Sequence, residues 1–115
     1  MKKDLGTGTL EITREVLTEI IATIASGCFG VKGMAEEGQG GIIRLIKRES
    51  ASKGVKVTEK PDGTIGTELH IIVRHGVNIS AICRSIIEEI RYSVETQTGI
   101  HVSSVDICVD SVMHD

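Results

Sequence analysis

Two stretches with apolar residues at three- and four-residue spacing constrain the fold of this chain more than any other feature. Their apolar positions are Val16, Leu17, Ile20, Ile21 and Ile24 in the first, and Ile79, Ile82, Cys83, Ile86, Ile87, Ile90 and Val94 in the second. Such spacing predicts two amphipathic helices, each with one face in the core. Thr13 and Asn78 are suited to cap their first turns, and Gly27 and Gly99 to end them.

Segments in which apolar and polar residues alternate flank both helices and predict β-strands. The clearest pair is 54–58 and 69–74, because Lys60-Pro61-Asp62-Gly63 between them suits a type I turn and predicts a hairpin. We also expect a strand over 9–12, a weaker strand over 30–35, an acidic glycine-rich loop over 36–41, a short helix with a basic face over 42–48 and a last strand over 104–110.

The resulting order is strand, helix, strand, short helix, strand, strand, helix, strand. It predicts an α/β (α+β) two-layer sandwich, in which a mixed sheet of about four to five strands carries the two long helices on one face. A chain of 115 residues has room for one domain. We place this domain at residues 8–112, after a disordered tail at residues 1–7.

Composition narrows the classes of partner. The chain has a net charge of −3, and its aromatic content is 2%, made up of Phe29 and Tyr92. Nucleic-acid binders are typically basic and stack bases on aromatic side chains, so both values argue against a nucleic-acid partner. No stretch reaches the ~18 to 20 apolar residues of a membrane span. Cys28, Cys83 and Cys108 form no CxxC pair, which fits buried thiols in a reducing cytoplasm.

The histidines and cysteines show no spacing typical of a metal or catalytic site. His70 and His75 are five residues apart, so an extended strand points them to opposite faces, and His101 and Cys108 have the same problem. Cys83 lies in an apolar helix stripe, where packing is the simpler role. We therefore expect no metal, no cofactor and no catalytic residues, and hence no enzyme.

One part of the chain is basic although the whole is acidic. Residues 41–60 hold two acidic residues and six basic ones: Arg44, Lys47, Arg48, Lys53, Lys56 and Lys60. This asymmetry is typical of a solvated charged face, or of a surface that contacts a membrane, a nucleic acid or the acidic face of a second copy. A second candidate contact surface is the polar sheet face with His70, Arg74, Asp106 and Asp110.

Several motifs together resemble a known family. They are Gly30-Val31-Lys32-Gly33-Met34, Lys53-Gly54-Val55-Lys56-Val57, Gly76-Val77-Asn78-Ile79 before the second helix, and a valine-rich last strand. In these positions the chain resembles the alkaline shock protein family of Gram-positive bacteria, the envelope stress response proteins. The resemblance runs from about Leu10 to Val112. His75 stands where the family pattern has an aromatic residue.

The resemblance implies a small, cytoplasmic, non-enzymatic protein that self-assembles and gathers at the membrane through a separate membrane-anchored partner. It brings no catalytic residues. Our leading hypothesis is a non-catalytic interaction domain that forms homo-oligomers. Two alternatives stay open: a nucleic-acid or RNA-associated domain that uses residues 44–60, and a carrier of a small apolar ligand in the groove between helices and sheet.

Overall fold

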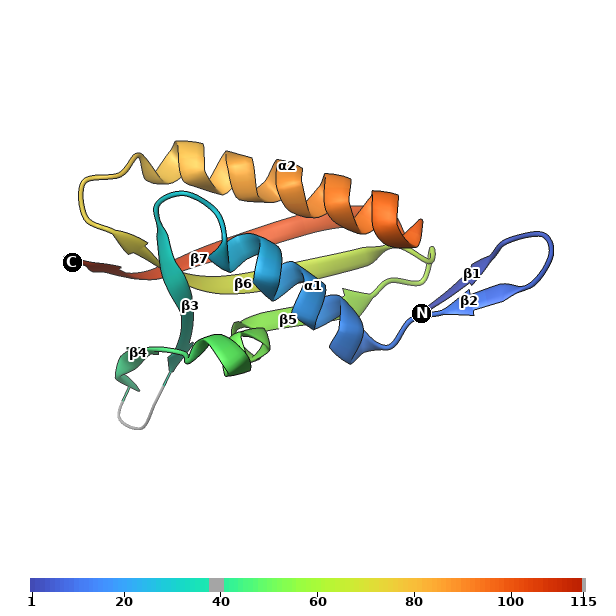
Figure 1. The fold of residues 1–115 in the computed structure, drawn as a ribbon, viewed down its shortest axis with the longest axis horizontal. Coiled ribbons are helices and arrows are strands. Elements are labelled where there is room, and N and C mark those ends of the chain that lie inside the picture. Colours follow the sequence, from blue (N-terminus) through green and yellow to red (C-terminus); the bar gives the residue numbers. More distant parts are fainter. Residues whose placement is uncertain (38–40, 115) are drawn as a thin grey trace.

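The chain folds around one long central strand. The computed structural model describes residues 1–37 and 41–114. For Glu37, Arg48 and Glu49 it describes the backbone only. Its elements, shown in Figure 1, are β1 (Lys2–Asp4), β2 (Thr9–Glu11), α1 (Arg14–Ser26), β3 (Val31–Glu37), β4 (Ile43–Leu45), the 3₁₀ helix η2 (Arg48–Gly54), β5 (Val55–Glu59), β6 (Ile65–Arg74), α2 (Ile79–Thr98) and β7 (Val102–Met113).

β6 pairs with three other strands in a mixed sheet of five. One edge of β6 runs parallel to β7 along the whole length of β6. The other edge is shared by two antiparallel strands, because β5 pairs with residues 65–69 and β3 with residues 71–73. β4 continues the sheet beyond β3. α2 connects β6 to β7, as a parallel crossover requires.

Both helices pack into the same hydrophobic core as the inward residues of the strands. Leu17 and Ile21 of α1, Ile86 and Ile90 of α2, and Leu69 of β6 have no exposed surface. These are the positions that helical and alternating periodicity predicted. The expected fold class is therefore confirmed: two helices and a mixed five-stranded sheet, with a small antiparallel β1–β2 sheet added.

Both long helices begin and end at the predicted residues. The side chain of Thr13 accepts a hydrogen bond from the backbone N–H of Val16 at 3.2 Å, and that of Asn78 accepts one from Ala81 at 3.0 Å. Each bond satisfies a backbone donor that the first turn leaves without a partner. Gly99 ends α2 with φ +74°, a backbone conformation that glycine adopts without steric cost.

The prediction of a short helix over 42–48 is wrong. Ile43–Leu45 form β4, antiparallel to β3, and residues 46 and 47 are neither helix nor strand before η2 begins at Arg48. A short apolar run supports a helix and a strand equally well, so periodicity alone does not separate them. Pairing with β3, which brings Arg44 opposite Glu36, is what makes this segment a strand.

Residues 36 and 37, which were expected in an acidic glycine-rich loop over 36–41, belong to β3. Residues 38–40 of that loop lie outside the described residues.

The N-terminal segment also differs from the sequence-based expectation. A disordered tail was expected over residues 1–7, but Lys2–Asp4 pair with Thr9–Glu11 in a hairpin that projects from the rest of the molecule (Figure 1). The amino group of Met1 donates to the carbonyl of Ile12 at 2.8 Å, at the base of this hairpin. In the described part of the chain, no helix combines the length and apolarity that crossing a bilayer requires.

Candidate functional site

Polar side chains gather on the sheet face opposite the helices, where β6 and β7 run side by side. Because side chains alternate along a strand, buried Leu69 and Ile71 leave Glu68 and His70 on the outer face. Parallel pairing places His70 directly opposite Cys108 of β7. Sequence alternation along β7 puts three polar residues on this face: Asp106, Cys108 and Asp110.

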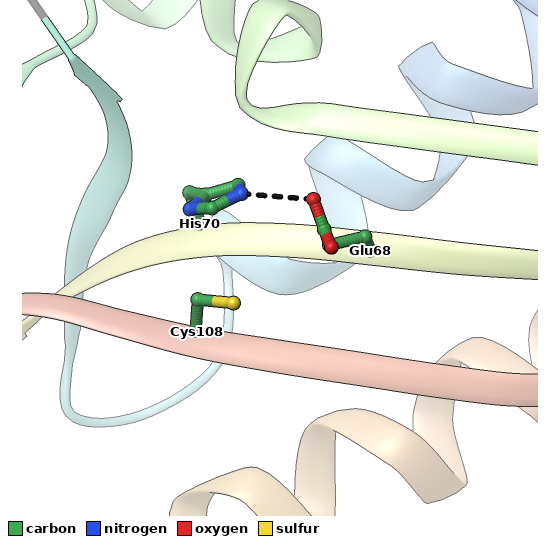
Figure 2. Close-up of side chains that lie close together, drawn as sticks. All are labelled: Glu68, His70 and Cys108. Carbon is green, nitrogen blue, oxygen red and sulfur yellow. Dashed lines mark hydrogen bonds and ion pairs between the residues drawn. The ribbon is translucent and has the colours of Figure 1, made fainter.

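His70 is held between two carboxylates. Its Nδ1 lies 2.9 Å from Oδ2 of Asp110, and its Nε2 lies 3.1 Å from Oε2 of Glu68. Figure 2 shows the second contact, with the thiol of Cys108 on the neighbouring strand. A carboxylate oxygen of Glu68, a ring nitrogen of His70 and Sγ of Cys108 all lie within 4.8 Å of one another. We call Glu68, His70, Cys108 and Asp110 the outer-face cluster.

The surroundings of this cluster shift two of its ionisation equilibria. Partial burial acts to lower the pKa of His70, but hydrogen bonds to Glu68 and Asp110 outweigh it, and the pKa is raised above 6.5. Burial raises the pKa of Cys108, and the nearby charges of Glu68, Asp110 and Asp106 raise it further. The thiol is therefore held protonated at neutral pH, in a field of negative charge.

A depression of about 390 Å³ lies beside the cluster. Its lining residues come from five elements of the fold: Ala35, Glu36, Ile43, Lys53, His70 and Asp110. One wall is fixed by an ion pair between Arg44 and Glu36, whose closest atoms are 3.4 Å apart. The depression brings one residue of the basic stretch, Lys53, to the same place as His70.

The basic stretch does not form one helical face, because it is spread over β4, η2, β5 and the turn after β5. Lys47 and Lys56 are exposed, and the side chain of Arg48 lies outside the described residues. Lys60 reaches β7, where its Nζ donates to Oγ of Ser104 at 3.2 Å. Arg74 lies at the end of β6, opposite Met113. Among the described residues, one depression thus brings together Lys53, His70 and Asp110, and a second one of about 280 Å³ brings together Arg44, Lys47 and Lys53.

The sequence matches the alkaline shock protein 23 family, described as having a cell envelope-related function, over residues 2–114. This match covers nearly the whole described chain. The chain belongs to the alkaline shock protein 23 family. The resemblance inferred from the sequence motifs is confirmed, and the function of the protein is cell envelope-related.

Relatives of this chain come from Bacillus subtilis and Streptococcus pyogenes. The uncharacterised protein YloU of Bacillus subtilis (strain 168) is 31% identical over 91% of this chain and 88% of its own length. YqhY of the same organism is 28% identical over 98% and 83%. An uncharacterised protein of Streptococcus pyogenes serotype M6 is 27% identical over 91% and 88%.

Solved structures with a similar fold lie outside the range of clear sequence similarity. A variant of MamM CTD is 13% identical, with a TM-score of 0.56, over 88% of this chain and 96% of its own. The nickel form of another MamM CTD variant is 12% identical, with a TM-score of 0.55, over 88% and 98%. At this level of sequence identity, the similarity shows that the two proteins share a fold, and it supports no statement about function.

Two residues of the outer-face cluster, Glu68 and Cys108, were not among the predicted contact residues of this family member. Comparing histidines and cysteines along the chain could not find them, since His70 and Cys108 meet through strand pairing. The sequence does hold one signal, because side chains two residues apart lie on the same face of a strand. Glu68 and His70 therefore share one face of their strand, and Cys108 and Asp110 share one face of theirs. Joining the two faces requires β6 and β7 to be neighbours in this register.

The ion pair between His70 and Asp110 makes a pH-dependent contribution to stability. Because the pKa of His70 is raised in the folded state, the stabilisation is fully present below the unfolded value of about 6.5 and is lost as the pH rises through the folded pKa. We expect an NMR titration of the metal-free protein to give a pKa for His70 above 6.5, and Asp110→Asn to lower it. An unchanged pKa in Asp110→Asn would contradict this assignment.

Proposed function

We propose that this domain is a non-catalytic interaction module of the cell envelope, which self-associates and is recruited in the cytoplasm to a membrane-anchored partner. The family's cell envelope-related function supports a place of action at the membrane. The absence of catalysis is supported by the thiols, because the pKa of each of Cys28, Cys83 and Cys108 is raised, chiefly by burial. Protonated thiols are poor nucleophiles.

The observation that carries self-association is the outer edge of β7. Over the described residues, this strand of 12 residues pairs only with β6. At its start, the N–H of Val102 donates to Glu95 and its carbonyl accepts from Arg91, and beyond Val102 the other edge has no strand partner. An open edge of this length is a template for pairing with another strand. A second copy offers the same edge, so two copies joined by a two-fold axis would satisfy each other's backbone groups.

The side chains of β7 support the same surface. Val105, Ile107 and Val109 point toward the core but stay only partly buried, unlike their counterparts on β6. Val112, near the end of the strand, is 45% exposed. A strand added to this edge would cover more of their apolar surface, which favours association.

Self-association is tested by light scattering coupled to size-exclusion chromatography. We expect the wild type to exceed the monomer mass of 12.3 kDa as the concentration rises. Val112→Lys places a charge on the open strand and should weaken association by at least about tenfold, which corresponds to about 1.4 kcal/mol. The matched control is Ile42→Lys, a 67% exposed position beside β4 at the opposite edge of the sheet, which should leave the mass unchanged.

Amide hydrogen exchange shows which surface is used. Exchange over residues 102–113 should slow as the concentration rises, while exchange on the exposed face of α2 should not. A strict monomer at all concentrations contradicts self-association. A dimer whose β7 amides exchange as fast as in the monomer contradicts the proposed edge.

Recruitment is tested by comparing cells with protein-free vesicles. We expect a share of the protein in the membrane fraction of a Gram-positive host, and no binding to purified vesicles that contain anionic lipid. Binding to the protein-free vesicles would contradict the need for a protein partner and would indicate direct contact of the basic residues with anionic lipid. Absence from the membrane fraction would contradict recruitment altogether.

Contacts among the described residues weigh against the two alternatives to this function, although Arg44, Lys47 and Lys53 line one depression of about 280 Å³. A nucleic-acid surface needs a continuous basic patch, but Arg44 is paired with Glu36 and Lys60 with Ser104. A ligand carrier needs open space between helices and sheet, but this space is filled by fully buried side chains such as Leu17 and Ile86.

A further inference from the structure

The outer-face cluster combines one nitrogen, one sulfur and one oxygen donor. They come from two strands, since Glu68 and His70 lie on β6 and Cys108 on β7 (Figure 2). Among the described residues, this is the one group of three histidine, cysteine or acidic side chains whose donor atoms all lie within 4.8 Å of one another. Nothing in the proposed interaction surface along the open edge of β7 uses this set.

The three donor atoms are nearly close enough to share one ion. Ligand atoms around a tetrahedral Zn²⁺ lie about 3.3–3.8 Å apart, given metal–ligand distances of about 2.0–2.3 Å. Oε2 of Glu68 and Nε2 of His70 already lie 3.1 Å apart. The remaining gap is at most about 1 Å, and the Glu68 side chain is 47% exposed, so rotation of this side chain can close the set.

Asp110 supports the three donors by holding His70 through a hydrogen bond, without itself being one of the ligands. Its carboxylate accepts a hydrogen bond from Nδ1 of His70 when that nitrogen carries the proton, and the two groups are 2.9 Å apart. An ion that binds Nε2 displaces the proton which this nitrogen shares with Glu68 in the imidazolium form, while Nδ1–H stays on Asp110. Histidines that bind metals typically donate their other N–H to a carboxylate in this way, which fixes the ring and raises its basicity as a ligand.

The charge and accessibility of the site suit a cation. Glu68, Asp106 and Asp110 all act on the Cys108 thiol, so an arriving ion meets negative charge from three carboxylates, against the ammonium group of Lys53 in the adjoining depression. His70 and Asp110 also line the depression of about 390 Å³, which gives an ion and its water a path from solvent. The mixed donor set excludes the hard cations Mg²⁺ and Ca²⁺, which take oxygen ligands.

We propose that Glu68, His70 and Cys108 bind one divalent late transition-metal ion of the Zn²⁺ type, with Asp110 as the outer partner of His70. Imidazole, thiolate and carboxylate are the three ligand types of protein zinc sites. Binding releases to solvent the thiol proton of Cys108 and, from the imidazolium form of His70, the proton on Nε2. Three protein ligands leave a fourth position for water. The site departs from the sequence-based expectation of no metal, which compared positions along the chain and not across the strands.

Titration of the metal-free protein with Zn²⁺ against a chromophoric chelator tests the proposal. We expect one ion per chain. Cys108→Ser and His70→Asn each remove a direct ligand and should weaken binding by at least about 100-fold, while Asp110→Asn should weaken it by roughly 10- to 100-fold. Glu68→Gln changes an exposed position, so its loss of affinity is free of folding effects.

Two control variants separate this site from other donors. Cys83→Ser removes a half-buried thiol on α2 and should leave the affinity unchanged. His114→Asn breaks the stacked pair of His75 and His114, whose ring centroids lie 4.1 Å apart, and should also leave it unchanged. Circular dichroism of each variant confirms that the fold is intact.

Spectroscopy with Co²⁺ in place of Zn²⁺ identifies the sulfur ligand directly. The wild type should show thiolate-to-cobalt charge-transfer absorption, and Cys108→Ser should lose it while Cys83→Ser keeps it. Three results would overturn the proposal: no stoichiometric binding of Zn²⁺, equal affinity in the wild type and Cys108→Ser, or loss of binding only in His114→Asn.

Discussion

Gly30→Ala is expected to lower the free energy of unfolding by about 2–4 kcal/mol, a large part of the 5–15 kcal/mol typical of a domain. Gly30 has φ +86°, where an added Cβ costs about 1–2 kcal/mol. The new methyl group would also collide with the side chain of Ile82 at the start of α2 and touch Val77. Because the nearest atom is the flexible end of Ile82, overpacking adds about 1–2 kcal/mol, the lower part of its usual range.

The backbone at this position cannot easily move to relieve the collision. The carbonyl of Gly30 accepts a hydrogen bond from the N–H of Arg74 at 2.9 Å, which holds the turn between α1 and β3 against the end of β6. Urea unfolding followed by circular dichroism measures the loss.

Gly76→Ala is the matched control for the steric part of this loss. Gly76 has φ +87°, nearly the same as Gly30, but nothing lies within 4 Å of an added Cβ. Only the backbone cost of about 1–2 kcal/mol should remain. If both variants lose the same free energy, the contact of Gly30 with Ile82 has no energetic weight and the close packing of α2 against this turn is refuted.

Leu69→Ala should destabilise the fold by about 2–5 kcal/mol, the range for truncating a fully buried leucine. Leu69 has no exposed surface and lies in the middle of β6, opposite Val55 on one edge and Ile107 on the other. Since strands occupy both edges of β6 here, the backbone has little freedom to collapse into the cavity. We therefore expect a value in the upper half of that range.

Val16→Ala provides the comparison at an apolar position outside the core. The stripe of α1 predicted Val16 to be buried, but it is 46% exposed. Its truncation should cost less than about 1 kcal/mol. Equilibrium unfolding of both variants under the same conditions gives the two values, and a similar loss for Val16→Ala and Leu69→Ala would show that the core is placed wrongly.

Features set by neighbouring residues could be predicted from the sequence. The turn at residues 60–63 depends on local conformational preferences, and Thr13 and Asn78 act on N–H groups three residues away. Such effects involve short distances along the chain, so the hairpin, the helix starts and the left-handed glycine at Gly99 were all correctly placed.

Features that depend on distant partners could not be predicted in the same way. Ile43–Leu45 become a strand because β3 offers an edge, and tertiary pairing outweighs a weak local preference. The outer-face cluster depends on an even longer separation, since His70 and Asp110 are 40 residues apart. Its polar residues were partly recognised as a contact surface, but their assembly follows from the register of β6 and β7.

This register has a consequence for how reliably the chain folds. Outward Asp106, Cys108 and Asp110 alternate on β7 with inward Val105 and its apolar neighbours. From Ser104 to Val109, where β7 pairs with β6 without a shift, a slip by a single residue would drive Asp106 into the apolar core and turn the valines out to water. Misaligned pairings of these parallel strands therefore cost much free energy, so the outward acidic side chain selects the native register of the β6–α2–β7 crossover.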